Sequence, residues 1–180
     1  MLIDLACLIC ASLASCTNRA FPKGTEDAKT IEPDEDYIIP FGKARIVQEA
    51  NEEHIKQAKS ISIITYGMGV YWAKAAAKKF EGQVEIIDLR TIAPIDEDAI
   101  FESASKHGKC MVLTEEPSNN GFAQSIASRI SQACFKKLDA PVMVIGAENL
   151  PAIPLNSILE KKMLPNADKV EKAIGDLLNY

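Results

Sequence analysis

Short apolar runs alternate with amphipathic segments along most of the chain, beginning near residue 37. Four runs are rich in β-branched residues and are bounded by turn residues, which predicts strands at residues 61–66, 84–89, 110–114 and 141–146. The segments between them carry apolar residues at helical spacing, which predicts helices at residues 68–80, 97–106, 122–136 and 167–178. Almost wholly apolar strands that alternate with helices indicate an α/β fold, with a mostly parallel sheet covered on both faces.

Residues suited to capping helices mark several of these boundaries. Asp96 is a favourable N-cap followed by acidic residues, and Gly108 is suited to ending the same helix. Asn166 stands at the start of the final helix. The helix at residues 122–136 has one apolar face that we expect to point into the core. This face consists of Phe122, Ile126, Ala127, Ile130 and Phe135.

The first 36 residues stand apart from this pattern. Residues 1–16 are apolar and residues 17–36 are a polar linker with Pro and Gly, so we expect one domain at residues 37–180. The apolar stretch is either a signal cleaved ahead of a lipidated Cys16, or a remnant or disordered end. A signal needs a basic start, and Asp4 stands there instead. The stretch is also shorter than the about 20 residues that span a bilayer.

Composition narrows the classes of function. The chain has 180 residues, 47% hydrophobic and 25% charged, with a net charge of −5, which is typical of a soluble globular protein. Its basic residues form no stripe and are not interleaved with aromatic residues, so a nucleic-acid partner is not expected.

The cysteines indicate a reducing compartment. They number five, and Cys110 and Cys134 lie in apolar stretches, so no disulfide framework is expected. Cys7 and Cys10 have the spacing of a redox or zinc motif, but no second pair of ligands follows. We therefore expect a cytoplasmic protein, and the alternative is a lipoprotein anchored through Cys16.

Two segments at predicted strand ends invite a catalytic interpretation. Tyr66-Gly67-Met68-Gly69 forms a strand-to-helix turn, which also suits close packing of the helix on the sheet. Glu115 and Glu116 follow the third predicted strand, where α/β sheets place their sites. Because neighbouring side chains in an extended strand point to opposite faces, Glu115 and Glu116 are not expected to act as an acid and base pair. The residues alone therefore predict an α/β domain without a recognisable active site.

Short segments along the chain follow the order in which one known family carries them. They are residues 39–44, 64–67, 87–96, 115–117, 121–123, 138–141 and 163–166. In this order they resemble the transketolase carboxy-terminal domain of the beta subunits of pyruvate and 2-oxoisovalerate dehydrogenases, which are thiamine-diphosphate-dependent 2-oxo acid dehydrogenases. The resemblance places the first strand of the domain at residues 39–44.

The resemblance implies a three-layer α/β/α domain with a five-stranded, mainly parallel, mixed sheet. In the complete oxidoreductase this domain follows a pyrimidine-binding domain, which is missing here. Thiamine diphosphate and Mg²⁺ belong to that missing part and to the alpha chain, so none is expected on this chain and no catalytic residue is assigned. The implied role is subunit association and docking of the dihydrolipoyl acyltransferase core, by a chain that is inactive alone.

Two anionic groups carry the docking hypothesis. Asp139, in Leu-Asp-Ala-Pro, resembles the acidic residue that faces a basic peripheral-subunit-binding domain, and the terminal carboxylate of Tyr180 resembles a second contact. We also expect a homo-oligomer, through apolar residues around Tyr71, Trp72 and residues 153–155. Two other functions remain open: a lipid-anchored envelope protein that uses this fold as a binding module, and the carboxy-terminal domain of another thiamine enzyme.

Overall fold

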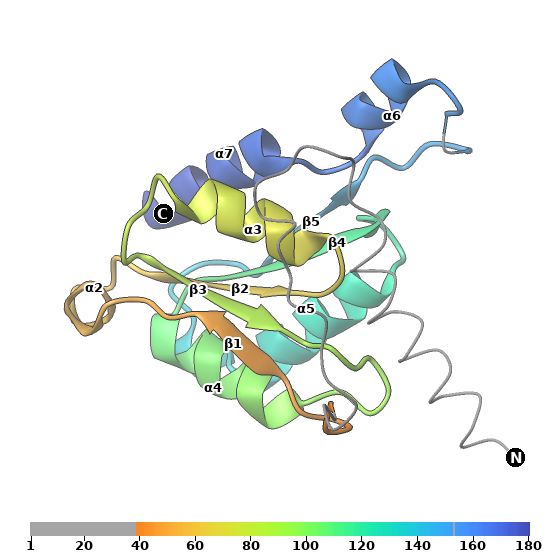
Figure 1. The fold of residues 1–180 in the computed structure, drawn as a ribbon. Helices are drawn as coiled ribbons and strands as arrows, with labels where there is room; N and C mark the ends of the chain where they lie inside the picture. Colours follow the sequence, from red (N-terminus) through yellow and green to blue (C-terminus); the bar gives the residue numbers. More distant parts are fainter. Residues whose placement is uncertain (1–38, 153) are drawn as a thin grey trace, which may run out of the picture.

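A single five-stranded sheet organises the computed structural model, which describes residues 39–152 and 154–180 (Figure 1). The strands are β1 (Arg45–Gln48), β2 (Ile61–Thr65), β3 (Val84–Asp88), β4 (Cys110–Pro117) and β5 (Met143–Ala147). Their order is β1-β3-β2-β4-β5, with β1 antiparallel to β3 and the other pairs parallel. The mixed, mainly parallel sheet confirms the fold class that the sequence predicts.

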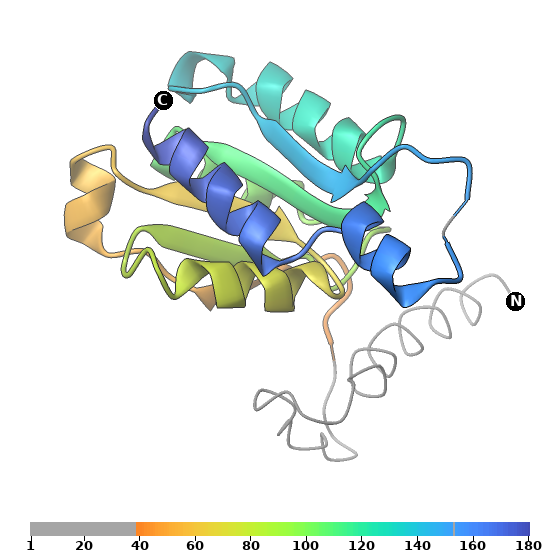
Figure 2. The same ribbon diagram turned by 90° about the horizontal axis from the view of Figure 1, so that it is seen from above.

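Helices cover both faces of this sheet. They are α2 (Glu52–Lys56), α3 (Gly69–Ala77), α4 (Glu97–His107), α5 (Phe122–Ala133), the 3-10 turn η2 (Phe135–Lys137), α6 (Ser157–Met163) and α7 (Ala167–Leu178). Helices α3 and α7 pack on one face, and α4 and α5 pack on the other (Figures 1 and 2). The result is the expected three-layer α/β/α arrangement.

The strands form two cores because their side chains alternate between the faces. Ile63 and Ile86 point into the core under α3 and α7, whereas Ile64 and Ile87 point into the core under α4 and α5. All five residues of β2 are buried, as a central strand covered on both faces requires.

The predicted caps are present at three helix ends. The Asp96 carboxylate accepts a hydrogen bond from the Ala99 N–H at 3.3 Å, and Asn166 accepts one from the Lys169 N–H at 2.9 Å. Gly108 adopts φ 68° after α4, a left-handed conformation that costs glycine least.

The first strand begins later than the resemblance places it. Residues 41–42 form a turn, and the strand itself spans Arg45–Gln48. Gly42 has φ 64°, and its N–H donates to the Thr91 hydroxyl at 3.0 Å. This turn directs the chain into antiparallel pairing with β3, so the strand forms only beyond it.

The predicted helix at residues 122–136 ends earlier than expected. Helix α5 stops at Ala133, and the chain tightens into the 3-10 turn η2. This change of winding rotates Phe135 off the apolar face, leaving its side chain 77% exposed, so the expectation that Phe135 points inward was wrong. The other four residues of the predicted face contact the core beside α4 and α5.

Candidate docking site

Three consecutive residues, the last of α4 and the two that lead into β4, connect three parts of the molecule. His107 belongs to a buried polar cluster, Gly108 contacts Asp139, and Lys109 contacts the end of α7. We call residues 107–109 the α4–β4 turn. This turn therefore joins the internal cluster to Asp139, one of the two predicted docking residues, and to the end of α7.

Asp139 lies against this turn through its backbone. Its N–H donates to the Gly108 carbonyl at 2.7 Å, and its carboxylate packs so closely on Gly108 that a Cβ there would collide with it. The Asp139 side chain nevertheless faces solvent. In the described part of the chain its carboxylate accepts no hydrogen bond and forms no ion pair. The result is an oriented carboxylate on the surface.

The chain end lies against the neighbouring residue of the same turn. Lys109 is 7% exposed, and its Nζ donates to the Leu178 carbonyl at 3.2 Å. Tyr180 follows two residues later and is 72% exposed. Figure 2 shows the C-terminus beside the chain that leads from η2 into β5, where Asp139 is located. Asp139 therefore contacts this turn directly, and the end of the chain contacts it through Leu178.

Beneath this turn lies a buried carboxylate that the sequence did not single out. Glu85 is 1% exposed and accepts hydrogen bonds from Ser103 Oγ and Lys106 Nζ, each at 2.6 Å. His107 Nε2 lies 3.2 Å from the same carboxylate. Burial raises the pKa of Glu85, but the His107, Lys106 and Ser103 donors together outweigh it and lower the pKa to about 2. Glu85 is therefore charged in the folded protein.

This cluster has the side chains of a hydrolase triad without access to substrate. Ser60 Oγ lies 2.8 Å from His107 Nδ1, and His107 Nε2 faces Glu85. All three residues are at most 3% exposed, so no acyl group reaches the serine hydroxyl. The three positions are far apart in sequence and only strand register unites them, which is why no motif revealed them. The geometry supports a structural role for the cluster.

At the opposite end of the sheet, β4 continues past its predicted end at residue 114 and includes Glu115 and Glu116. Glu116 Oε1 accepts the Ala123 N–H at 2.6 Å, and so satisfies a backbone donor in the first turn of α5. The Tyr66 hydroxyl forms a hydrogen bond with Thr114 Oγ1 at 2.8 Å. Burial raises the pKa of Tyr66. At Gly69 a Cβ would collide with Thr65 Oγ1, which supports the close-packing explanation of the glycine turn. These contacts give Glu116, Tyr66 and Gly69 structural roles.

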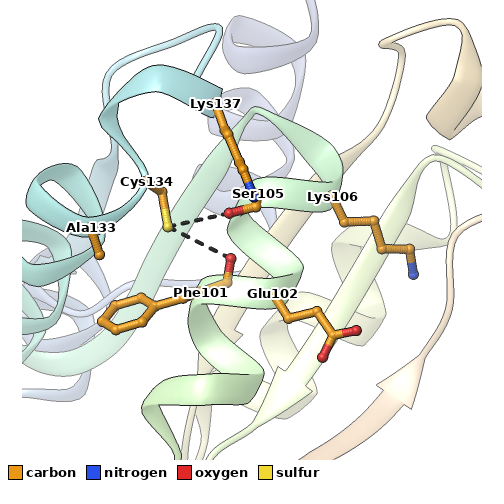
Figure 3. A pocket seen from close by; sticks show the side chains of 7 residues that line it. All are labelled: Phe101, Glu102, Ser105, Lys106, Ala133, Cys134 and Lys137. Carbon is orange, nitrogen blue, oxygen red and sulfur yellow. Dashed lines mark hydrogen bonds between the residues drawn. The ribbon is translucent and has the colours of Figure 1, made fainter.

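A hollow of about 500 Å³ lies between α4 and the end of α5, away from Glu116 and Tyr66 (Figure 3). Cys134 contributes its thiol, which accepts a hydrogen bond from Ser105 Oγ at 3.4 Å and donates to the Phe101 carbonyl at 3.6 Å. The Lys137 side chain runs toward Ser105 on this side of η2. Cys110 and Cys134 are both free and buried, as expected of cysteines that pack as small apolar residues.

The described residues contain neither a candidate metal site nor a helix that could span a membrane. Residues 39–152 and 154–180 contain no group of three His, Cys, Asp or Glu side chains that could hold a metal ion. The helices of this region are also too short or too polar to cross a bilayer. Cys7, Cys10 and Cys16, on which the zinc and lipoprotein interpretations depend, lie outside the described residues.

The fold and the order of its segments define a known class of domain. The family model described as "Transketolase, C-terminal domain" matches residues 50–170, so the chain belongs to this family. The match covers the sheet from β2 to β5 and the helices from α2 to α6.

The relatives that the chain resembles include beta subunits of 2-oxo acid dehydrogenases and of acetoin oxidoreductases. The chain is 36% identical to the 2-oxoisovalerate dehydrogenase subunit beta of Bacillus subtilis, over 82% of this chain and 44% of that protein. It is 36% identical to the pyruvate dehydrogenase E1 component subunit beta of Rhizobium meliloti, over 78% of this chain and 29% of that protein. The chain thus spans less than half the length of these relatives.

A solved structure supports the fold. The protein titled "Split gene transketolase, inactive beta4 tetramer" matches 81% of this chain and 45% of its own, with a TM-score of 0.63 and 21% identity. At this identity the likeness concerns the fold alone.

Proposed function

We propose that this chain is the association and docking domain of a thiamine-diphosphate-dependent 2-oxo acid dehydrogenase beta subunit, located in the cytoplasm. The observation that supports the proposal is the exposed Asp139 carboxylate against the α4–β4 turn, which also contacts Leu178, two residues before the exposed Tyr180. The family membership supports the enzyme class, and the relatives' names leave the 2-oxo acid open.

Catalysis in this proposal belongs to the part of the enzyme that the chain does not span. Thiamine diphosphate needs an anchored diphosphate, a metal and a pyrimidine pocket, and these would come from the pyrimidine-binding domain and the alpha chain. We expect calorimetry with thiamine diphosphate and Mg²⁺ to detect no binding, and the purified chain to decarboxylate neither pyruvate nor branched 2-oxo acids. Turnover by the purified chain would refute this part of the proposal.

The docking partner is a basic peripheral-subunit-binding domain of the dihydrolipoyl acyltransferase core. Each charge-assisted contact to Asp139 or to the Tyr180 carboxylate would contribute about 1.5–3 kcal/mol if desolvated, and less at a solvated rim. A short Gly-Ser extension after Tyr180 moves the carboxylate away from the surface. We expect this extension to weaken binding about tenfold in a titration with the acyltransferase. An extension at the amino terminus is the matched control.

Self-association is the third part of the proposal. Tyr71 and Trp72 are half-buried, and Trp72 packs against the core, so neither offers a free apolar surface. By contrast, Leu155, Ile158 and Leu159 are 106%, 67% and 52% exposed on and before α6, which projects from the body in Figure 1. Such a stripe is typical of a protein interface.

We expect light scattering to detect dimers or larger species that disappear in the double variant Leu155→Glu, Ile158→Lys. The matched control places the same charges at exposed positions away from the stripe, with Gln132→Glu and Ser128→Lys. A monomeric wild-type chain at high concentration would remove self-association from the proposal while leaving docking intact.

A further inference from the structure

One peptide bond in the loop between β4 and α5 joins an asparagine to a glycine. Asn120 is the only asparagine of the sequence that precedes a glycine. It is exposed, and its backbone has φ 59°, a left-handed conformation that asparagine adopts more readily than most residues. Gly121 follows as the N-cap of α5. The pair therefore lies at an accessible turn, outside the hydrogen bonding of a helix or strand.

An Asn-Gly pair can rearrange without an enzyme. The glycine nitrogen attacks the Cγ carbonyl of the asparagine and forms a new C–N bond, and the side-chain nitrogen leaves as ammonia with the proton of the glycine amide. Water then opens the resulting five-membered succinimide at either carbonyl, which gives aspartate or isoaspartate. Asparagine is for this reason a thermolabile residue, and a following glycine favours ring closure because it has no Cβ to obstruct the rotation.

The two groups that would react are not held in place. Among residues 39–152 and 154–180, neither the Asn120 side chain nor the Gly121 N–H forms a hydrogen bond. Other asparagine side chains of this region are fixed. The Asn156 and Asn166 carbonyls accept helix N–H groups, and the Asn179 amide donates to the Gly175 carbonyl at 2.9 Å. Residues with side chains follow all three. Sequence and contacts therefore single out Asn120.

The turn around this pair is closely packed against α5. The Glu116 carboxylate lies so near Gly121 that a Cβ there would collide with it, and the same carboxylate accepts the Ala123 N–H in the first turn of the helix. The Asn120 N–H donates to Gln124 Oε1 at 2.9 Å. Isoaspartate inserts one methylene group into the main chain between these contacts. A longer backbone at this point would therefore displace Gly121 from Glu116.

We propose that Asn120 is a site of spontaneous deamidation, which converts it to aspartate or isoaspartate and loosens the first turn of α5. The reaction consumes only water, and either product places a new carboxylate beside Glu116. The inference is independent of the docking function, because the loop follows the end of β4 at Pro117, whereas the α4–β4 turn precedes its beginning at Cys110.

Ageing of the purified full chain at mildly alkaline pH tests the site. Peptide mass spectrometry follows the conversion of each amide, and an isoaspartyl methyltransferase labels isoaspartate. We expect Asn120 to convert at least about tenfold faster than Asn119, because the residue after Asn119 has a side chain. Asn120→His is the matched variant, since histidine also tolerates a left-handed backbone but has no amide to lose. It should form no isoaspartate in this loop.

The effect on α5 has a separate measurement. We expect the aged wild-type chain to melt about 2–4 °C below the fresh chain, and aged Asn120→His to melt like fresh Asn120→His. If Asn120 stays intact while Asn119 or Asn149 converts, the site is wrong. If Asn120 converts and the melting temperature does not change, the coupling of the site to α5 is wrong.

Discussion

Two carboxylates adjoin the α4–β4 turn and have opposite surroundings. Glu85 is 1% exposed and meets Ser103, Lys106 and His107, whereas Asp139 faces solvent with no hydrogen bond to its carboxylate in the described residues. A buried charge surrounded by donors stabilises a fold only while those partners remain. An exposed, oriented charge contributes little to stability and is available to a partner.

The comparison assigns separate tasks to the two groups. Glu85 and His107 fix the end of α4, and so hold the turn on which Asp139 rests. Changes at Glu85 should therefore appear mainly in the free energy of unfolding, and changes at Asp139 mainly in the affinity for a partner.

Replacing Glu85 with Gln should produce the largest loss of stability. The amide would place N–H groups against donors and leave the Lys106 and His107 side chains without their carboxylate. We expect the free energy of unfolding in urea to fall by about 3–5 kcal/mol. Glu52→Gln is the control, because the Glu52–Lys56 pair is exposed and should contribute at most about 0.5 kcal/mol. Equal effects of the two changes would contradict a structural role for the Glu85 cluster.

Acid should remove the contribution of Glu85 over a defined range of pH. The pKa of Glu85 is lowered from 4.5 to about 2 in the folded chain, so its stabilisation is present above pH 4.5 and lost as the pH falls toward 2. We expect this loss to reach about 3 kcal/mol in the wild type and to be absent from Glu85→Gln. Urea titrations of both proteins at several acidic pH values measure the difference. Parallel pH profiles would show that Glu85 is not the group responsible.

Substituting Gly108 should have an intermediate effect on both tasks. Ala at φ 68° is strained, and its Cβ would collide with the Asp139 carboxylate. We expect Gly108→Ala to destabilise the fold by about 1–2 kcal/mol and also to weaken acyltransferase binding. Gly175→Ala is the matched control, since its Cβ in α7 would meet nothing within 4 Å, and it should stabilise by roughly 0.5–1 kcal/mol. Unchanged acyltransferase binding by Gly108→Ala would show that this turn does not position the docking surface.

The pattern of apolar and polar residues was sufficient to predict the layers, and the bounds of β2, β3, α4 and α7 to within one residue. Runs such as residues 61–65 are apolar at every central position except Ser62, and only a strand covered on both faces buries them. Asp96 and Gly108 marked the ends of α4 because their capping chemistry is local. The exposure of Asp139 was also predictable, since the apolar strand residues begin after Pro141.

Features that depend on register or on small changes of winding were not predictable. Glu85 looks like an ordinary strand residue, and only the pairing of β2 with β3 and β4 brings it to Ser103 and His107. Phe135 fits the periodicity of α5, and no residue before it signals that the helix ends at Ala133.

The affinity of Asp139→Asn for the acyltransferase tests the docking account most directly. This change removes one exposed charge and keeps the shape of the side chain, so the free energy of unfolding should stay within about 0.5 kcal/mol of wild type. The account predicts that the dissociation constant rises about tenfold or more, which corresponds to about 1.4 kcal/mol. A variant that binds the acyltransferase as tightly as the wild type would contradict it.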